Sequence, residues 1–582
     1  MSGYFLEGGV RDQAVTTGTL VRDLDAQYRA AVPSLEPIDI GVGFYEIWNN
    51  SIYNSALYVT LGGESPIVRH VHRKVFLPTY GLFDEERFVD RGFEIRAFDT
   101  SWGRAAMLVC EDAWHSLSGT IAALDGAQMI FIPSASPARG LQPRTDEVTG
   151  PSNLERWERL ARDIASEHGV FTGLVHLVGS EGGKTFPGGS VVAGPRGDVK
   201  LRAPLWEEAI ATVTLDTSEL TRARVELPLL TDLQTMLPHL MRTIGKIQVN
   251  EELPLDYDPA SANGQTSVGI VSGAPSGREW KPEAGAAAEN AASALTKPSD
   301  ITVITAPSSV MGPPSLSIDA AFTADWLVNF LRDELKLRGF TRGIVGVSGG
   351  VDSAVTAYLA ARALGPSNVV GVRMPYKTSS SDSLTHAQFV IDALGIQSRT
   401  VDITDAVDGY LAKEPDASPG RRGNVMARTR MIVLFDQSER EKALPLGTGN
   451  KTERLLGYFT WHADDSPPIN PLGDLFKTQV WALARHLGVP DEIVNKPASA
   501  DLIEGQTDEG DFGISYARAD EILNWLVNGY SAADVGEHGF THAEVELIWK
   551  RLSKTHWKRR LPTVAMLSSS AIGETYLRPV DY

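Results

Sequence analysis

Short runs of hydrophobic residues recur along the first part of the chain, separated by helical or irregular segments. Five of these runs predict strands, at residues 38–43, 56–61, 105–109, 129–132 and 170–176. Strands that alternate with helices or loops in this way are typical of an α/β domain. We therefore expect residues 1–250 to form such a domain.

The pattern becomes more regular after residue 317. Apolar residues at helical spacing predict a helix over 319–338 with one buried face. Beyond it the pattern predicts strands at 343–347, 368–375 and 398–403, and helices at 354–364, 381–394 and 425–439. Residues 443–450 are predicted to end a further strand in a second glycine turn. This alternation predicts a doubly wound parallel sheet covered on both faces, with ligands at the carboxyl ends of its strands.

Residues 251–316 differ from both flanking regions because they are rich in Pro, Gly, Ser and Ala. A chain of 582 residues is too long for a single core. Long structureless segments are unusual inside a compact domain. We therefore interpret 251–316 as a linker between two domains, 1–250 and 317–582.

A glycine-rich turn, SGGVDS at 348–353, joins the predicted strand 343–347 to the helix that follows it. Unpaired N–H groups at a helix start attract an anion, and glycines let the backbone approach a phosphate closely. The turn lacks the GxxxxGK[ST] pattern of the P-loop. It predicts a nucleotide-phosphate site in which Asp352 either binds Mg²⁺ or caps the helix.

Composition narrows the class of protein. The net charge of −19 disfavours broad nucleic-acid binding. No apolar run reaches the roughly 18 residues of a membrane span, and the N-terminus lacks the pattern of a signal peptide. Cys110 is the only cysteine, so intramolecular disulfides cannot form and a reducing, cytoplasmic location is expected.

Seven motifs in the C-terminal region together resemble the NAD synthetase family of ATP pyrophosphatases, over residues 319–565. They are SGGVDS (348–353), MPYKTSS (374–380), NVMARTRM (424–431), LGTGNKTE (446–453), GYFTWHADD (457–465), INPLGDLFKTQVWALARHLGVP (469–490) and KPASADLIEGQTDE (496–509). The resemblance implies a ligase that uses ATP to adenylate the nicotinate carboxylate of deamido-NAD. Ammonia would then displace AMP to give NAD, after pyrophosphate has left.

The resemblance also assigns roles to single residues. It implies ATP contacts for Ser348, Gly349, Gly350, Asp352, Ser353, Thr448 and Lys477. It implies Mg²⁺ as a cofactor, with Asp352 and Glu453 as its ligands. Contacts to deamido-NAD are implied for Arg428, Asp464 and Asp474, and a basic pair that closes the site for His556 and Lys558. Because a carboxylate attacking a phosphate joins two anions, Mg²⁺ and basic side chains are needed there.

Cys110 follows the predicted strand 105–109, a position that projects a side chain into a site. A lysine near a cysteine lowers the thiol pKa and can stabilise an oxyanion, and Lys74 is the candidate. Residues 3–225 resemble the nitrilase superfamily of carbon–nitrogen hydrolases, whose fold is an α/β sandwich. In glutamine-dependent NAD synthetases such a domain releases ammonia from glutamine. The resemblance implies Cys110 and Lys74 as catalytic residues, Tyr80 and Ser136 as substrate contacts, and Glu85 as an auxiliary carboxylate.

The nitrilase resemblance also requires a glutamate general base a few residues before a Gly-Tyr pair. Gly3-Tyr4 match that pair, so the glutamate, with the first strand and helix, is expected upstream of Met1. Glu46 falls at a later strand and is not assigned this role. Either the sequence starts too late, or the enzyme uses free ammonia.

An amidase with an inert synthetase-like domain is disfavoured by the intact SGGVDS and LGTGNKTE motifs, and three functions remain open from the sequence. The leading hypothesis is a glutamine-hydrolysing NAD synthase, and the first alternative is the same ligase using free ammonia. A tRNA-modifying ATP pyrophosphatase is disfavoured, because thiolating members usually need further cysteines and this chain has only Cys110. The resemblance further implies a homo-oligomer.

Overall fold

The computed structural model describes residues 10–79, 85–142, 149–181, 184–246, 312–499 and 507–559. Most of the predicted linker, the Gly3-Tyr4 pair and Tyr80 lie outside these residues. Residues 235–312 cluster apart from the rest of the chain, and the structure describes 235–246 and 312 of them. The N-terminal region (10–246) and the C-terminal region (312–559) are described separately below.

Two sheets build the N-terminal region. The first has the antiparallel order β1-β2-β3, with β1 (Ile38–Trp48), β2 (Ser51–Leu61) and β3 (Ile67–Arg73). The second has the order β11-β10-β7-β6-β5-β4, with parallel pairing among β5, β6 and β7. Its strands are β4 (Ala97–Asp99), β5 (Arg104–Met107), β6 (Met129–Ser134), β7 (Phe171–His176), β10 (Val191–Ala193) and β11 (Val199–Arg202).

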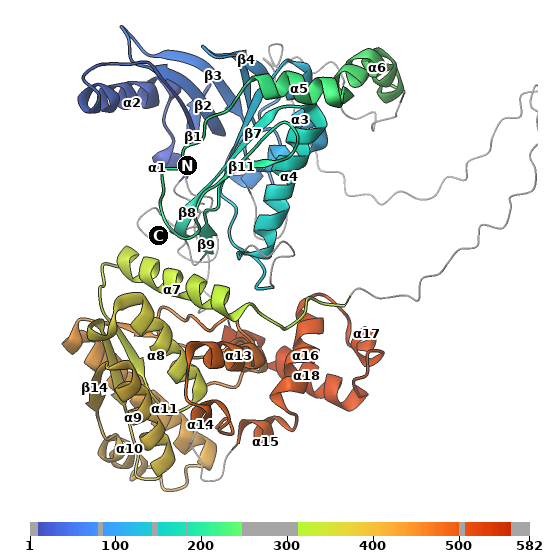
Figure 1. The fold of residues 1–582 in the computed structure, drawn as a ribbon. Helices are drawn as coiled ribbons and strands as arrows, with labels where there is room; N and C mark the ends of the chain where they lie inside the picture. Colours follow the sequence, from blue (N-terminus) through green and yellow to red (C-terminus); the bar gives the residue numbers. More distant parts are fainter. Residues whose placement is uncertain are drawn as a thin grey trace, which may run out of the picture. The chain divides into compact units, whose positions relative to one another are not determined.

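Helices and one hairpin complete this region. The helices are α1 (Val10–Gln13), α2 (Thr17–Ala31), α3 (Ser116–Leu124), α4 (Ser152–His168), α5 (Ser218–Glu226) and α6 (Leu229–Ile244), with short 3₁₀ turns η2 (Glu85–Arg87) and η3 (Cys110–Trp114). The hairpin is β8 (Val178–Glu181) with β9 (Lys184–Pro187). Figure 1 shows α3 and α4 lying along the second sheet and α2 beside the first.

Three apolar clusters explain why these layers stack. Ala56 and Tyr58 of the first sheet pack against Ala105 and Met107 of the second. The opposite face of the second sheet buries Ile130, Ile132 and Leu174 against Trp157 and Ile164 of α4. On the outer face of the first sheet, α2 packs Val21 against Leu57 and Val59. The predicted α/β sandwich is confirmed as helix, sheet, sheet and helix.

The C-terminal region contains a fully parallel sheet with the order β14-β13-β12-β15. Its strands are β12 (Gly343–Gly346), β13 (Val369–Arg373), β14 (Gln397–Thr400) and β15 (Leu444–Leu446). The helices are α7 (Ala320–Leu337), α8 (Val351–Leu364), α9 (Ser381–Leu394), α10 (Thr404–Leu411), α11 (Pro419–Glu441), α12 (Lys451–Leu456), α13 (Lys477–Leu487), α14 (Asp491–Val494), α15 (Asp508–Phe512), α16 (Tyr516–Val527), α17 (Ala532–Gly536) and α18 (His542–Lys554), with 3₁₀ turns η4 (Pro366–Asn368) and η5 (His556–Arg559).

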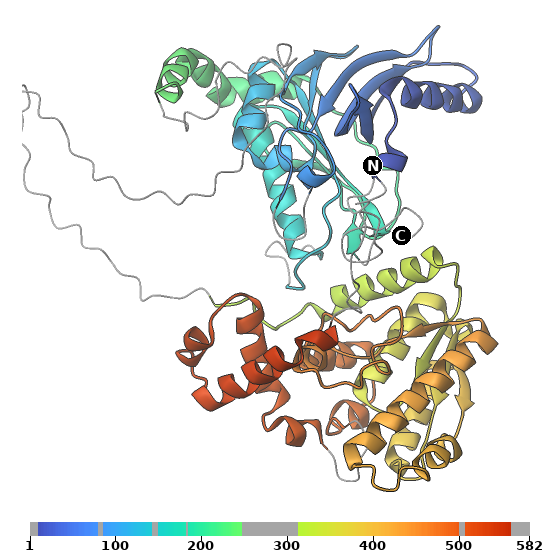
Figure 2. The same ribbon diagram turned by 180° about the vertical axis from the view of Figure 1, so that it is seen from behind.

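Alternate residues of the central strand face opposite layers, as expected for a sheet buried on both sides. Val345 packs into the cluster formed with α7, α8 and α13. Its neighbour Ile344 packs with Leu434 of α11 on the other face. The view in Figure 1 shows α8 in front, and the reverse view in Figure 2 shows the long α11, in orange, in front of the sheet. The predicted doubly wound sheet is confirmed.

None of the helices that the structure describes is both long and apolar enough to cross a membrane.

Candidate active sites

The SGGVDS turn connects the carboxyl end of β12 to the start of α8, as predicted. Gly349 has a φ of +80°, and a Cβ there would lie 2.2 Å from the carbonyl oxygen of Ser383. Only glycine fits this position without moving the backbone. Gly350 is the N-cap of α8, and because it has no side chain it cannot accept hydrogen bonds from the first N–H groups of this helix. The hydroxyls of Ser348 and Ser353 lie 3.1 Å apart and close the turn.

A cavity of about 380 Å³ opens above this turn at the carboxyl ends of β12, β13 and β15. Eight of the predicted site residues line it: Ser348, Gly350, Asp352, Ser353, Thr448, Glu453, Asp464 and Lys477. The second glycine turn, which follows β15, supplies Thr448 and leads through its N-cap residue Asn450 into α12 with Glu453. Segments distant in the sequence therefore converge on one site because parallel strands end at the same edge of the sheet.

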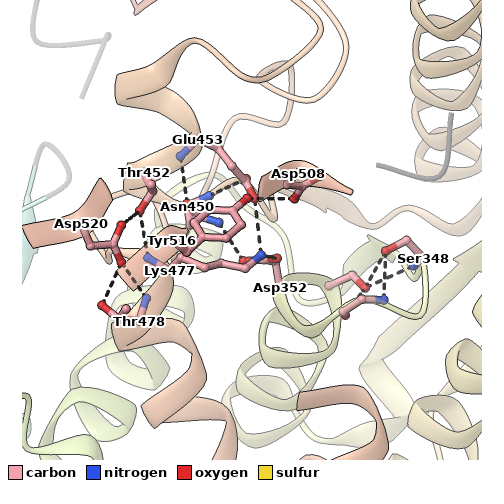
Figure 3. A network of polar contacts seen from close by, with 12 residues as sticks. Ser348, Asp352, Asn450, Thr452, Glu453, Lys477, Thr478, Asp508, Tyr516 and Asp520 are labelled. Carbon is pink, nitrogen blue, oxygen red and sulfur yellow. Dashed lines mark hydrogen bonds and ion pairs between the residues drawn. The ribbon is translucent and has the colours of Figure 1, made fainter. Parts of the chain in front are cut away.

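Two carboxylates share one buried ammonium group in the wall of this cavity. Lys477 Nζ donates to Asp352 Oδ2 at 2.5 Å and lies 3.5 Å from Glu453 Oε1, as Figure 3 shows. The side chain of Lys477 is only 2% exposed, and those of Asp352 and Glu453 are 18% and 17% exposed. Burial lowers the pKa of Lys477, but the two carboxylates outweigh it and raise the pKa. Lys477 therefore stays protonated.

Asp352 and Glu453 are two residues of this wall that could hold a divalent cation. Burial and the neighbouring Asp352 raise the pKa of Glu453 to about 8, although Lys477 opposes the shift. A further positive charge would let both carboxylates ionise. Within the described ranges no three His, Cys, Asp or Glu side chains form a metal cluster. Mg²⁺ suits such a place, since it is commonly held by one or two carboxylates together with phosphate oxygens.

Three residues of this network were not predicted from the sequence. Asn450, fully buried, donates from Nδ2 to Asp352 Oδ1 at 3.0 Å while its Oδ1 accepts from the backbone of Glu453. Asp508 lines the cavity and accepts from the hydroxyl of Tyr516 at 2.8 Å. The order Asn-Lys-Thr-Glu at 450–453 is that of a capping box, which could have drawn attention to Asn450.

Arg428 and Asp474 are not among the residues that line the cavity. Arg428 Nη2 donates to the carbonyl of Trp461 at 3.1 Å. The side chain of Asp474 is 96% exposed and pairs with Lys451 at 2.8 Å. Arg430, two residues beyond Arg428, does line the cavity, and it was missed because both arginines belong to the same motif. The roles of Arg428 and Asp474 stay predictions.

The predicted basic pair lies in η5. Lys558 Nζ donates to the carbonyls of Gly457 and Phe459, each at 2.9 Å, and so anchors the segment that follows α12. His556 Nδ1 lies 2.7 Å from the carbonyl of Ser553. Phe459 lines the cavity, so Lys558 holds in place a segment that forms part of the cavity wall.

A second candidate site surrounds Cys110, the first residue of η3. Cys110 has a φ of +49°, a left-handed conformation that costs a non-glycine residue about 1–3 kcal/mol and is common at functional sites. Ser134 Oγ lies 3.6 Å from its sulfur. Burial raises the pKa of the Cys110 thiol above its ordinary value, although the charge of Lys74 and the contact with Ser134 oppose this shift.

Lys74 is 1% exposed and follows directly after β3. Its ammonium group donates to Glu85 Oε2 at 2.5 Å, and Asn54 Nδ2 donates to Glu85 Oε1 at 2.6 Å. Burial lowers the pKa of Lys74, but the charges of Glu85 and Cys110 outweigh burial and raise the pKa above its ordinary value. Lys74 therefore stays positively charged beside the thiol. The structure therefore brings the predicted trio of Cys110, Lys74 and Glu85 together.

Asp112, which was not predicted from the sequence, joins the two segments of this site. Its fully buried carboxylate accepts from the backbones of Val75 and Phe76 at 2.9 Å each, and from the backbone of Val109 at 3.1 Å. It also lies 2.8 Å from His72 Nε2. The carboxylate thereby fixes the segment after Lys74 against the turn that carries Cys110. Its position two residues after Cys110 was the available signal.

Ser136 and Glu46 have partners that bear on their predicted roles. Trp157 Nε1 donates to Ser136 Oγ at 2.9 Å. Glu46 accepts two hydrogen bonds from Arg73, at 2.8 and 2.9 Å, and a third from Ser55. Both carboxylate oxygens of Glu46 are occupied by these hydrogen bonds, and its exclusion from the catalytic set stays a prediction.

Two protein families match separate regions of the chain. Residues 323–562 match the NAD synthase family, and residues 36–225 match the carbon-nitrogen hydrolase family. The NH(3)-dependent NAD(+) synthetase of Chlorobaculum parvum is 46% identical over 264 residues, which are 45% of this chain and 95% of that protein. The enzyme of the same name from Fusobacterium nucleatum is 46% identical over 242 residues, which are 41% of this chain and 94% of that protein.

Two solved structures resemble nearly the whole chain. The glutamine-dependent NAD+ synthetase of Acinetobacter baumannii, in complex with ADP, gives a TM-score of 0.63 at 20% identity and covers 100% of this chain and 90% of its own. That of Cytophaga hutchinsonii gives 0.59 at 14% identity, over 96% and 86%. At these identities the likeness concerns the fold. Because relatives 46% identical are matched over nearly their whole length, the chain belongs to the NAD synthase family.

Proposed function

We propose that this enzyme amidates deamido-NAD to NAD with ATP and takes its ammonia from glutamine hydrolysed at Cys110. The observation that carries the proposal is the cavity at the SGGVDS turn, whose wall holds Lys477 between Asp352 and Glu453. A cavity of this composition suits a nucleoside triphosphate with a divalent cation. The proposal assigns ammonia production to residues 1–250 and ligation to 317–582, joined by the linker 251–316.

In the ligase reaction, an oxygen of the nicotinate carboxylate attacks the α-phosphorus of ATP and pyrophosphate leaves. The N–H groups at the start of α8 and the hydroxyls of Ser348, Ser353 and Thr448 hold the phosphates, and Lys477 offsets their charge. Mg²⁺, held by Asp352 and Glu453, would supply further charge compensation. Ammonia then attacks the adenylated carboxyl carbon, its nitrogen gives up a proton to solvent, and AMP leaves with the bonding electron pair.

In the N-terminal region, the sulfur of Cys110 attacks the carboxamide carbon of glutamine, and ammonia leaves once its nitrogen is protonated. Water then cleaves the thioester to give glutamate and restore the thiol. The charge of Lys74 favours the thiolate and the oxyanion that forms on attack. Tyr80 and Ser136 are proposed to contact glutamine, and Arg428, Asp464 and Asp474 to contact deamido-NAD. We also propose that the enzyme works as a homo-oligomer.

The nitrogen source separates this proposal from an ammonia-only ligase. We expect wild-type protein to form NAD from deamido-NAD and ATP with either glutamine or ammonium chloride. Cys110→Ala removes the sulfur nucleophile, so glutamine-driven synthesis should fall to background while ammonium-driven synthesis persists. Asp352→Asn serves as the matched variant of the other site, and it should lose synthesis from both nitrogen sources.

Two outcomes would overturn parts of the proposal. If Cys110→Ala keeps its glutamine-driven activity, the nucleophile is wrongly assigned. If wild-type protein uses only ammonium, the enzyme is an ammonia-dependent synthase, like the named relatives that match its C-terminal region. The close association of Cys110, Lys74 and Glu85 is what favours glutamine.

A further inference from the structure

A buried carboxylate on α16 lies behind the cavity wall without lining the cavity. Asp520 is fully buried and accepts three hydrogen bonds. Thr452 Oγ1 donates to its Oδ1 at 2.5 Å, and Thr478 donates to its Oδ2 from both its backbone at 2.9 Å and its hydroxyl at 2.8 Å. Figure 3 shows Asp520 between these two threonines, on the far side of them from Asp352.

These contacts supply what the start of α13 lacks. The first N–H groups of a helix need acceptors from outside its own turns. Phe476, the N-cap of α13, has no side-chain oxygen to offer. The backbone N–H of Lys477 is accepted instead by Thr452 Oγ1 at 3.0 Å, and that of Thr478 by Asp520. The two first helical residues of α13 are therefore held by groups on α12 and α16.

The hydroxyl of Thr452 links the two halves of this arrangement. The hydroxyl oxygen accepts from the backbone N–H of Lys477, and the hydroxyl donates its one hydrogen bond to the carboxylate of Asp520. Thr452 directly precedes Glu453 in α12. These two hydrogen bonds therefore join the start of α13, which carries Lys477, to the turn of α12 that carries Glu453, and they link both to Asp520.

The same face of α16 also contacts the other end of Lys477. Tyr516 lies four residues before Asp520, which places both side chains on one face of the helix. The Nζ atom of Lys477 lies 5.1 Å from the centre of the Tyr516 ring, within the range of a cation–π contact. Asp520 therefore holds the backbone around Lys477 while Tyr516 confines its charged end.

We infer that Asp520 is a positioning residue of the ligase site, which holds Lys477 and Glu453 in register for the phosphates of ATP. This inference rests on the proposed function. Asp520 acts through Thr452 and Thr478 and contacts no substrate. Groups that orient metal ligands, such as the proposed ligand Glu453, typically change metal affinity or activity by about 10–100-fold when they are replaced.

The test measures binding of ATP in the presence of magnesium by isothermal titration calorimetry, without deamido-NAD, so that no turnover occurs. We expect Asp520→Asn and Thr452→Val to weaken this binding by about 10–100-fold. Thr452→Ser keeps the hydroxyl and should restore binding to near the wild-type level. Asp534→Asn is the matched control, because Asp534 also accepts at a helix start, from Ser531 of α17, and does not line the cavity. It should leave binding unchanged.

The steady-state constants provide a second readout. In Asp520→Asn we expect the KM for ATP to rise, while the KM for deamido-NAD stays within about twofold, because a general loss of structure would not single out ATP. Unchanged ATP affinity in a folded Asp520→Asn protein would overturn the inference. If that variant does not fold, the Thr452→Val and Thr452→Ser pair decides, and equal affinities in the two would equally overturn it. Failure of the proposed function is distinct, because wild-type protein would then bind ATP yet form no NAD.

Discussion

The thiol of Cys110 is subject to two opposing influences, and a single substitution separates them. Burial raises its pKa, and the Lys74 charge is the largest influence that lowers it. Lys74→Met keeps most of the side-chain volume but removes the charge, so the pKa of Cys110 should rise further. We expect the rate of alkylation by iodoacetamide, followed against pH, to shift to higher pH and to fall several-fold at neutral pH.

Lys200→Met is the control for this experiment. Lys200 belongs to β11 of the same region and pairs with Asp198 and Glu219 at 2.8 and 2.7 Å. Its loss removes an ion-paired lysine without touching Cys110, so the alkylation profile should match that of the wild type. A Lys74→Met profile that also matches the wild type would mean that Lys74 does not activate the thiol.

At the residue scale, sequence motifs identify residues that would contact ligands, but they seldom identify the residues that support those contacts. Cys110, Lys74, Asp352 and Lys477 could be proposed because their chemistry and their flanking residues are local in the sequence. Asp520 could not, since its role depends on threonines 68 and 42 residues away. Such supporting contacts exist only once separate helices have packed together.

At the level of elements, the turn between β12 and α8 allows a sharp test. Alanine at Gly349 would combine a left-handed φ of +80° with a Cβ placed 2.2 Å from the Ser383 carbonyl oxygen. The backbone must therefore move, and the N–H groups at the start of α8 with it. We expect Gly349→Ala to weaken ATP binding by at least about tenfold and to lower the free energy of unfolding by about 1–3 kcal/mol.

Gly339→Ala distinguishes the clash from the unfavourable dihedral angle. Gly339 follows α7 with a φ of +75°, but a Cβ there meets no atom within 4 Å. Its replacement should cost about 1–2 kcal/mol in the free energy of unfolding and leave ATP binding unchanged. Equal ATP affinities of the two variants would show that the conformation of Gly349 is not needed for the site.

The elements themselves were largely predictable, and their ends were not. Apolar runs located β5, β6, β7, β12 and β13 because buried strands must be apolar. The strand predicted to end in a glycine turn within 443–450 is β15, which ends at Leu446, and the sequence did not fix that end. The predicted helix 354–364 begins three residues earlier, at Val351. Turns that hold ligands follow local hydrogen bonds, which hydrophobic periodicity does not report.

At the scale of the whole molecule, the alternation of strands and helices predicted two α/β regions, and the resemblance to known families predicted that their sheets differ. The order of the strands within each sheet could not be predicted in this way. The position of β15 beside β12 depends on a pairing between residues about 100 positions apart, such as Gly343 with Leu444. This pairing is what brings the two glycine turns together. The sequence motifs indicated that the two glycine turns contact the same ligand. The order of the strands in the sheet explains how these two turns come to lie side by side.

Stability should depend on pH through a buried histidine in the N-terminal region. His176, at the end of β7, is 8% exposed, and burial lowers its pKa to about 4 from an ordinary value of about 6.5. Between these values the unfolded chain binds a proton that the folded protein does not, so the free energy of unfolding must fall as pH falls from 6.5 to 4. The shift corresponds to about 3 kcal/mol for this one group.

His176→Gln removes the titrating group. The free energy of unfolding of the variant, measured by urea denaturation, should therefore fall less over this pH range than that of the wild type. If the two proteins lose the same amount, the imidazole of His176 is already protonated in the folded state or remains in contact with water.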